Sequence, residues 1–237
     1  MIEKNLLPFI SNEDLYEQVK RVLSVAEAAT SEAEEKLHKN VIDPFSALFD
    51  ASYQGVSFEQ WLKQEQSRQI QKTFQNAIGT FHQSILGAMP GWKDLKTGSI
   101  VDIVNSERKI IAEIKNKYNT TKGNHKSAIY TNLHKLINKE YSGCTAYYVE
   151  IIPKGGKMYD KSFTPSDNNL HSQKRADSHI RIIDGRSFYA LASGYPDAIE
   201  QLYTALPQVI QDILQKPDSS LLKKEELAEL FSKAYSR

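Results

Sequence analysis

Three ionisable residues near the middle of the chain have the types and spacing of a site that handles phosphate. Asp102 lies in the run SIVDIV, and Glu113 and Lys115 lie in KIIAEIKNK, with ten residues between Asp102 and Glu113. Two carboxylates held side by side are costly unless a cation lies between them. We therefore expect a hard divalent ion such as Mg²⁺ there, able to polarise a phosphate and acidify a bound water. Lys115 would position that water or stabilise the transition state.

The two runs are expected to pair as a hairpin, and the length of its loop decides where Asp102 lies. A two-residue loop, Glu107–Arg108, sets Asp102 directly opposite Glu113, whereas a four-residue loop, Asn105–Arg108, makes them diagonal neighbours. Both loops keep the three ionisable residues on one face, because an even change in loop length preserves the alternation of side chains. A three-residue loop would separate them. The competing interpretation is an ordinary buried ion pair between Lys115 and one carboxylate.

The rest of the chain predicts helices before and after this hairpin. Helical spacing of apolar residues is expected over residues 12–39, capped by Ser11 or Asn12, and over about 58–86, capped by Ser57. The other expected elements are strands at 99–104, 109–117, 145–152, 180–183 and 187–192, a helix at 125–141, a turn at 52–55, a long loop at 154–179 and a mostly helical stretch at 196–236, with Pro207 and Pro217 as candidate breaks.

This order of elements predicts an α/β (α+β) fold with a mixed central β-sheet and helices on both faces. We divide the chain into an N-terminal helical region, residues 1–57, packed on the core, and a catalytic and recognition domain, residues 58–237.

Composition narrows the class of protein. The 40% hydrophobic and 25% charged content is that of an ordinary globular protein. No run of about 18 apolar residues occurs, so we expect no membrane partner. The single cysteine, Cys144, excludes an intramolecular disulfide and fits a reducing compartment. We therefore expect a cytoplasmic protein.

Positive charge is concentrated around the hairpin, although the net charge is only +1. Between Arg108 and Lys126 six basic residues stand against one acid, Glu113. Such a concentration favours a polyanion-binding face, the alternative being a solvated basic loop.

The hairpin resembles the PD-(D/E)xK nuclease superfamily, whose signature is an aspartate near the end of one strand and (D/E)-x-K on the next, followed by a helix and a strand. Asp102 and Glu113 match the metal-ligand positions and Lys115 the lysine position, while Val101 stands in place of the signature proline. The resemblance implies a restriction-endonuclease-like core. Many members also use an acidic residue on the helix before the sheet, for which Glu65 is the candidate and Glu59 the lesser one.

Longer stretches resemble type II restriction endonucleases that cleave GGNCC-type sites. These stretches are QSRQIQKTFQNAIGTFHQSILG, GSIVDIV, IIAEIKNKYNTTKGNHK and SHIRIIDGRSFYALASG, and the resemblance covers about residues 40–215. It implies Mg²⁺-dependent hydrolysis of double-stranded DNA at a short GC-rich site, by a homodimer with one active site per strand. It also implies a cognate DNA methyltransferase in the same system, although not as a bound partner.

Polar side chains after the hairpin and in the long loop are suited to holding and reading DNA, because arginine and lysine contacts to guanine are the commonest specific ones. The candidates are Lys117, Asn119, Lys122, Asn124, His125, Lys126, Lys174, Arg175, His179 and Arg181. Two other functions fit the same core: a repair or junction-resolving nuclease that reads DNA shape, and a DNA-binding protein that does no chemistry.

Overall fold

The computed structural model describes residues 5–33, 35, 41–96, 98–167, 172–215 and 223–235. In chain order the elements are α1 (Asn12–Ser31), α3 (Pro44–Gln54), α4 (Phe58–Gly87), β1 (Lys93–Asp94), β2 (Ile103–Asn105), β3 (Ile110–Lys117), α5 (Gly123–Ile137), β4 (Thr145–Ile152), the 3₁₀ turn η1 (Lys154–Gly156), β5 (Asp160–Ser162), β6 (Ser166–Asp167), β7 (Ser172–Gln173), β8 (Ile180–Asp184), α6 (Gly185–Ser193), α7 (Ala198–Leu214) and α8 (Lys224–Tyr235).

The chain forms two compact units. The larger one contains residues 1–19 and 81–237, and the smaller one residues 20–80. Both α1 and α4 run through the boundary between them. The domain boundary expected after residue 57 stays a prediction.

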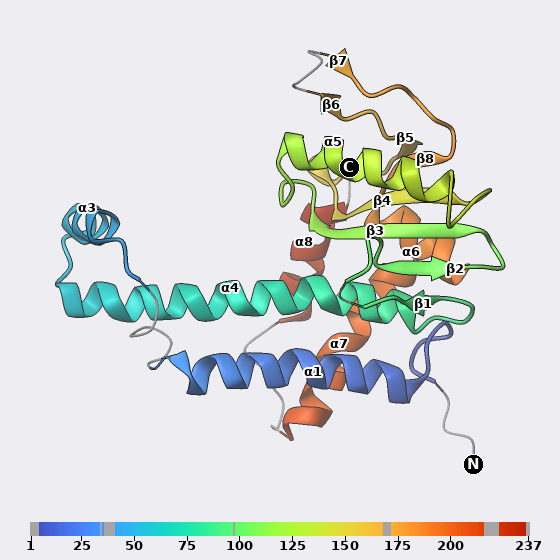
Figure 1. Ribbon diagram of the computed structural model, residues 1–237. Coiled ribbons are helices and arrows are strands. Elements are labelled where there is room, and N and C mark those ends of the chain that lie inside the picture. The colour runs from blue at the N-terminus through green and yellow to red at the C-terminus, as the bar shows by residue number, and fades with distance from the viewer. Residues whose placement is uncertain are drawn as a thin grey trace. The chain divides into compact units, whose positions relative to one another are not determined.

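A six-stranded mixed sheet forms the centre of the larger unit (Figure 1). The strand order is β1-β2-β3-β4-β8-β5, in which β3, β4 and β8 are parallel and the outer pairings are antiparallel. Parallel neighbours need a crossover, and α5 supplies it between β3 and β4. The expected α/β (α+β) fold, a mixed sheet flanked by helices with a helical N-terminal region, is confirmed.

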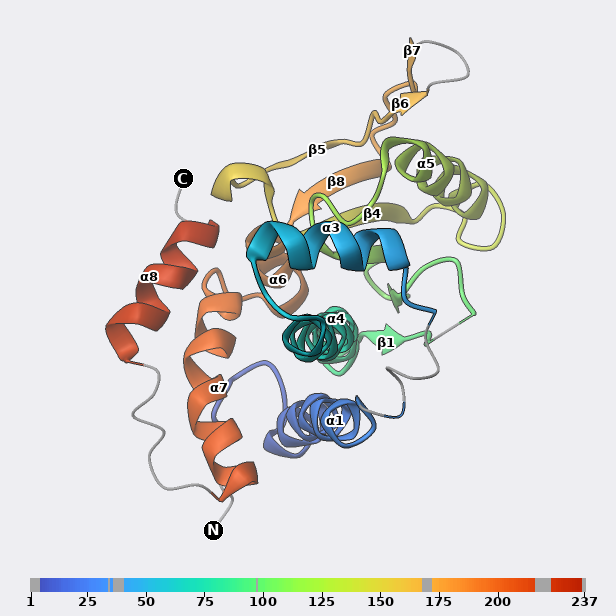
Figure 2. The ribbon, with the colours of Figure 1, turned by 90° about the vertical axis from the view of Figure 1, so that its left-hand side faces the viewer.

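Helices cover both faces of the sheet, α5 on one and α6 on the other (Figure 2). Beneath α5, Leu133 packs in one buried cluster with Ile111 and Tyr148 of the sheet. On the opposite face the ring of Phe188 in α6 lies 5.8 Å from that of Tyr147 in β4. Neighbouring residues on one strand therefore pack into two different hydrophobic cores, one on each face of the sheet, which is why both faces of these strands are apolar.

Local signals explain several element ends. Ser57 Oγ accepts a hydrogen bond from the Gln60 N–H while Gln60 Oε1 accepts one from the Ser57 N–H, which is a capping box at the start of α4. Asp184 caps α6 by accepting from the Ser187 N–H. Gly185 follows because a Cβ there would lie 2.3 Å from the Ile151 carbonyl oxygen.

Two sequence predictions of element type are wrong. The stretch 52–55 is not a free turn but the end of helix α3, whose C-cap is Gly55 in the left-handed conformation. The stretch 187–192, predicted as a strand, lies inside helix α6. Its run of apolar residues fits either structure, and the Asp184 cap decides for the helix.

Other predictions need smaller corrections. The strand expected at 99–104 is reduced to β2, which covers Ile103–Asn105, and β1 pairs with it in antiparallel direction. Helix α7 continues through Pro207, which was a candidate break. The long loop contains η1 and three short strands. Pro217 and most of residues 34–39 lie outside the described residues. In the described ranges no helix has the length and apolarity to cross a membrane.

Candidate active site

Asp102 lies at the edge of β2 rather than within it. Its N–H donates to the Ala112 carbonyl at 2.9 Å, and its own carbonyl accepts from the Leu95 N–H at 2.8 Å. The carboxylate is fixed as well, because Oδ2 accepts a 2.6 Å hydrogen bond from the Ile114 N–H. Two backbone contacts and one side-chain contact, from two neighbouring segments, thus hold this residue beside the middle of β3.

The register of the hairpin agrees with one of the two alternatives left open by the sequence. The ladder pairs Ile103 with Ala112 and Asn105 with Ile110, and the turn between them has four residues, 106–109. One step further along each strand lie Asp102 and Glu113. Asp102 is thus opposite Glu113, which is the register expected from the two-residue loop, although the observed turn has four residues.

The structure brings Glu113 and Lys115 together on the next strand. Lys115 Nζ lies 2.5 Å from Glu113 Oε1, and their side chains are 31% and 13% exposed. Both belong to the sheet face that α5 covers, since Glu113 is paired with Tyr148 of the core beneath that helix. The lysine therefore sits at the solvent-reachable side of a mostly buried carboxylate.

The two carboxyl groups perturb each other. Burial raises the pKa of Glu113, and the negative charge of Asp102 raises it further. Burial also raises the pKa of Asp102, against the opposing effects of the Ile114 N–H and the Lys115 charge. The two residues occupy neighbouring positions across the hairpin, one step beyond the paired Ile103 and Ala112. Such a pair needs a proton or a cation between its oxygens.

Sequence reasoning missed a third acid near this pair, Asp94 on β1. Its negative charge adds to the raised pKa of Asp102. Asp94 is held by a 2.8 Å hydrogen bond from Gln83 Nε2 and accepts another from the Lys96 N–H. The signal was hidden because a two-residue strand has no periodicity, and only its pairing with β2 brings Asp94 near Asp102.

A second ionic group continues the same face on β4. Glu150, which is 3% exposed and paired with Lys115 in the strand register, accepts from Lys126 Nζ and from the Tyr159 hydroxyl. Lys126 Nζ also donates to the Tyr118 carbonyl at 3.1 Å and lies 5.4 Å from the centre of the Tyr148 ring. Lys126, a predicted DNA-binding residue, is thus engaged inside the protein.

The other basic and amide candidates after the hairpin lie on the surface where β3 passes into α5. Lys117 ends β3, and its carbonyl accepts two hydrogen bonds from Thr120 that form the following turn. Lys122 is the N-cap residue of α5. The exposed candidates in this region are Lys117, Asn119, Lys122, Asn124 and His125. These five candidates therefore form one exposed group, which begins two residues after Lys115 in the chain.

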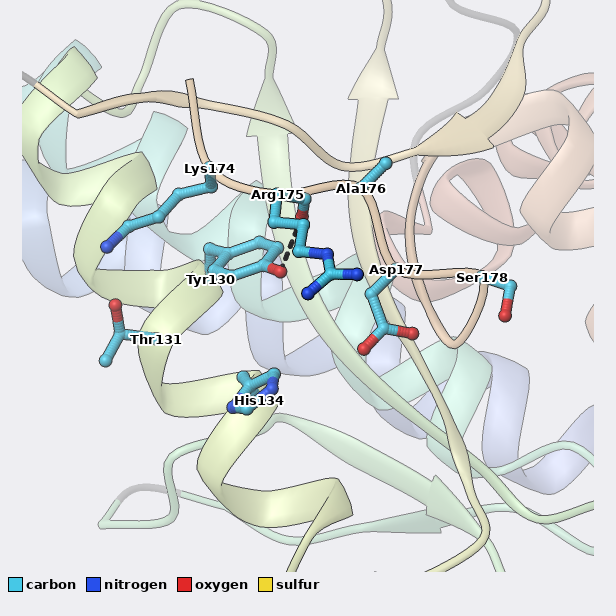
Figure 3. Close-up of a pocket in the computed structure, with 8 residues that line it drawn as sticks. All are labelled: Tyr130, Thr131, His134, Lys174, Arg175, Ala176, Asp177 and Ser178. Carbon is cyan, nitrogen blue, oxygen red and sulfur yellow. Dashed lines mark hydrogen bonds between the residues drawn. The ribbon is translucent and has the colours of Figure 1, made fainter. Parts of the chain in front are cut away.

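The candidates from the long loop form a separate group. A pocket of about 610 Å³ lies between α5 and residues 174–178, with Lys174 and Arg175 on one side and His134 on the other (Figure 3). Tyr130 also lines the pocket, and its hydroxyl donates to the Arg175 carbonyl. Arg175 is exposed, whereas Lys174 is half-buried.

Both remaining loop candidates contact an aspartate, and Nδ1 of the His179 ring lies 3.6 Å from Asp177 Oδ1. His179 is exposed, and its N–H donates to Asp177. Arg181 on β8 is engaged, because its guanidinium donates to both the carboxylate and the carbonyl of Asp160.

The accessory acid expected on the preceding helix lies in the smaller unit. Glu65 accepts from both Arg68 and Gln69 one turn away, and the Arg68 hydrogen bond lowers the pKa of its carboxyl. Glu59 forms an exposed pair with Lys63. Both contacts are those of ordinary helix-surface charges.

The chemistry of the donor set agrees with a hard divalent ion. Asp102 and Glu113 offer carboxylate oxygens in a place where two negative charges are poorly solvated. In the described part of the chain no three His, Cys, Asp or Glu side chains form a cluster able to hold a metal. The remaining ligands would therefore be water, backbone or substrate oxygens.

Comparison with known proteins identifies the family of the chain. The family model of the Eco47II restriction endonuclease matches residues 7–215. The chain is 43% identical to the type II restriction enzyme Eco47II of Escherichia coli, over 98% of this chain and 99% of the relative. It is 30% identical to the type II restriction enzyme Sau96I of Staphylococcus aureus, over 98% and 88%. No solved structure matches. The chain thus belongs to the Eco47II restriction endonuclease family, and it is a type II, site-specific DNA endonuclease.

Proposed function

We propose that Asp102, Glu113 and Lys115 are the catalytic residues, and that the chain hydrolyses phosphodiester bonds of duplex DNA at a short GC-rich, GGNCC-like site. The observation that carries the proposal is the placement of two mostly buried carboxyl groups at neighbouring positions across one hairpin, one of them paired with a lysine. A structural ion pair would need only one carboxylate. The second acid is unexplained unless something positive is bound.

Asp102 and Glu113 would hold a divalent ion, which we propose to be Mg²⁺. When bound, such an ion polarises the phosphate and lowers the pKa of a bound water. Restriction endonucleases generally use a divalent metal, and Mg²⁺ prefers the carboxylate and water oxygens available here.

The chain's own residues have separate tasks in this proposal. Ile114 N–H holds one oxygen of the Asp102 carboxylate, which leaves the other oxygen for the ion. Lys115 Nζ is held at Glu113 and can donate to a phosphate oxygen or to the attacking water. The exposed residues Lys117 and Lys122 would hold backbone phosphates beside the cut, which supplies affinity without sequence choice.

Sequence choice is assigned to the loop before β8. Arg175 is the best placed base-reading candidate, because its side chain is exposed at the pocket in front of α5, whereas Arg181 is occupied by Asp160. We further propose a homodimer with one active site per strand, and a cognate DNA methyltransferase in the same system.

The catalytic assignment predicts a separation of cutting from binding. Asp102→Asn and Glu113→Gln keep the size of each side chain but remove a charge, so cleavage of plasmid DNA with Mg²⁺ should fall by more than about 100-fold. Binding to the same DNA, measured by fluorescence anisotropy without a divalent ion, should change little. Glu107→Gln, in the exposed turn of the same hairpin, is the control and should cut normally. Retained cutting by either site variant would overturn the assignment.

A further inference from the structure

The smaller unit presents large apolar side chains to solvent from one helix. On α3, Phe45, Leu48, Phe49 and Tyr53 are 71%, 63%, 74% and 92% exposed, and we call these four residues the α3 face. Six of the thirteen exposed large hydrophobic side chains of the described residues lie in residues 41–58. Exposed apolar residues are ordinary when scattered, but a contiguous group marks an interaction site.

The outward direction of the α3 face is fixed by the rest of the helix. Successive residues turn by about 100°, so the four side chains share one side, opposite Ala47 and Asp50. Ala47 is buried, and Asp50 accepts a 3.0 Å hydrogen bond from the Trp61 indole of α4. Both ends of the helix are also capped, by Asp43 and by Gly55. The helix is therefore anchored by its other side.

Charge excludes two classes of partner for the α3 face. Helix α3 contains no lysine or arginine, and its one charged residue, Asp50, is tied to Trp61 and Gln54. DNA binding requires basic side chains opposite the phosphates. Helices that lie on membranes carry lysine and arginine on their polar side. An apolar, uncharged surface is instead complementary to a second apolar surface, and an identical one satisfies this condition.

The area is of the size that a dimer contact needs. A buried aromatic side chain covers about 150–250 Å², so three mostly exposed aromatics and a leucine offer on the order of 500 Å². A standard interface takes about 800 Å² from each partner. The α3 face can therefore supply more than half of one.

We propose that two copies of this chain associate through the α3 face, with the two α3 helices packed against each other across a two-fold axis. The proposal rests on the homodimer of the proposed function and deepens it by naming the contact. Phe49 lies in the middle of the α3 face, between Phe45 and Tyr53, so a two-fold axis that passes through the centre of the face brings each Phe49 near its own counterpart.

The test is the mass of the protein in solution, measured by sedimentation equilibrium over a range of concentrations. The wild type should be a dimer, and Phe45→Glu/Phe49→Glu should weaken association by at least about 100-fold while leaving the far-ultraviolet circular dichroism spectrum of the folded chain unchanged. Leu230→Glu, which places a charge on an apolar side chain of α8 that is 62% exposed, should remain dimeric. A monomeric wild type, or a double variant that stays dimeric, overturns the proposal.

A charge-pairing experiment tests the symmetry directly. Phe49→Glu and Phe49→Lys should each be monomeric alone and should associate when mixed, because the two opposite charges then meet across the axis. A fall in melting temperature without a change in mass would mean that the chain covers the α3 face itself, and would reject the proposal. Cleavage loss in Asp102→Asn is independent of these outcomes, so a failure of the active site and a failure of the dimer contact are distinguished.

Discussion

At the scale of single residues, the main feature is the negative charge shared by Asp102 and Glu113. Burial and mutual repulsion raise both pKa values. A group with a raised pKa stabilises the folded state below its unfolded pKa, and this contribution is lost as the pH rises through the folded pKa. Near neutral pH the metal-free site is therefore a source of instability, and a bound cation should remove it.

Metal binding should accordingly be visible as stability, without any DNA. A ligand at about 100 times its dissociation constant adds about 2.7 kcal/mol, which for a chain of this length corresponds to a rise of about 5–10 °C in melting temperature. We expect Mg²⁺ to produce such a rise in the wild type and in Glu107→Gln, but not in Glu113→Gln. Equal rises in all three proteins, measured by scanning calorimetry, would place the ion elsewhere.

His82 makes the stability of the folded chain depend on pH in the opposite direction, because its pKa is lowered and not raised. Its partly buried ring is hydrogen-bonded to the Tyr189 hydroxyl at 2.8 Å, and desolvation lowers its pKa from 6.5 to about 4. The unfolded chain therefore takes up a proton first, so stability is full above pH 6.5 and is lost as the pH falls towards 4. The loss is at most about 3 kcal/mol, and less where the ring edge remains hydrated.

Urea unfolding at pH 7 and pH 5 measures this contribution. His82→Gln should show a smaller loss between the two pH values than the wild type. His134→Gln, which changes an exposed histidine on α5, should retain the wild-type loss. An unchanged difference in His82→Gln would show that other groups cause it.

At the scale of elements, α5 is attached to the sheet beside the active site by an ion pair as well as by its apolar side. Lys126 bonds to Glu150 of β4 and to the Tyr118 carbonyl just after β3. One side chain thus connects the helix, the strand that carries Lys115 and the next strand. Its loss would leave Glu150 as a buried charge without its cation.

Lys126→Met should therefore act mainly on stability. Removing one member of a buried ion pair costs roughly 3–5 kcal/mol, and the low end is expected because Lys126 retains 23% exposure. Glu150→Gln added to Lys126→Met should recover part of this loss. Lys122→Met, on the exposed N-cap of the same helix, should weaken DNA binding and reduce its salt dependence with little effect on unfolding. If Lys126→Met only weakens DNA binding, the residue serves as a phosphate contact.

The elements also show what the sequence could and could not predict. The sequence predicts strand β4 over the residues that it occupies, because an eight-residue run that contains six β-branched or aromatic residues and is stopped by Pro153 has one good interpretation. The face shared by Glu113 and Lys115 followed from alternation alone. By contrast, the apolar pattern at residues 187–192 predicts a strand inside what is helix α6, since the helical identity of this segment depends on the Asp184 cap and on the close approach of Gly185 to Ile151.

Contacts between distant segments explain the two differences between expectation and structure near the site, which concern Asp94 and Lys126. Asp94 lies near enough to affect the pKa of Asp102 only because β1 pairs with β2. Lys126 donates to Glu150, which is 24 residues away in the sequence. Neither contact leaves a periodic signal in the chain. Residue types and local spacing therefore predict which residues form the candidate site, while the residues that support it become visible only in the fold.

At the scale of the whole molecule, Asp102, Glu113 and Lys115 all come from one chain and from one hairpin. Each copy in a homodimer would therefore carry a complete candidate site. Cutting both strands of DNA then requires two such sites, one on each strand. A dimer with a single working site should break only one strand per binding event.

This expectation can be tested with a mixed dimer. Wild-type and Asp102→Asn chains carrying different affinity tags are expressed together, and the dimer that holds one of each is isolated through both tags. Supercoiled plasmid should be converted to the nicked circle, which accumulates because the linear form requires a second binding event in the opposite orientation. A mixed dimer of wild type with Glu107→Gln, whose exposed change leaves both hairpins complete, should yield the linear form directly. Linear product from the Asp102→Asn mixture at the wild-type rate would mean that one site cuts both strands, and the assignment of one site to each strand would have to be abandoned.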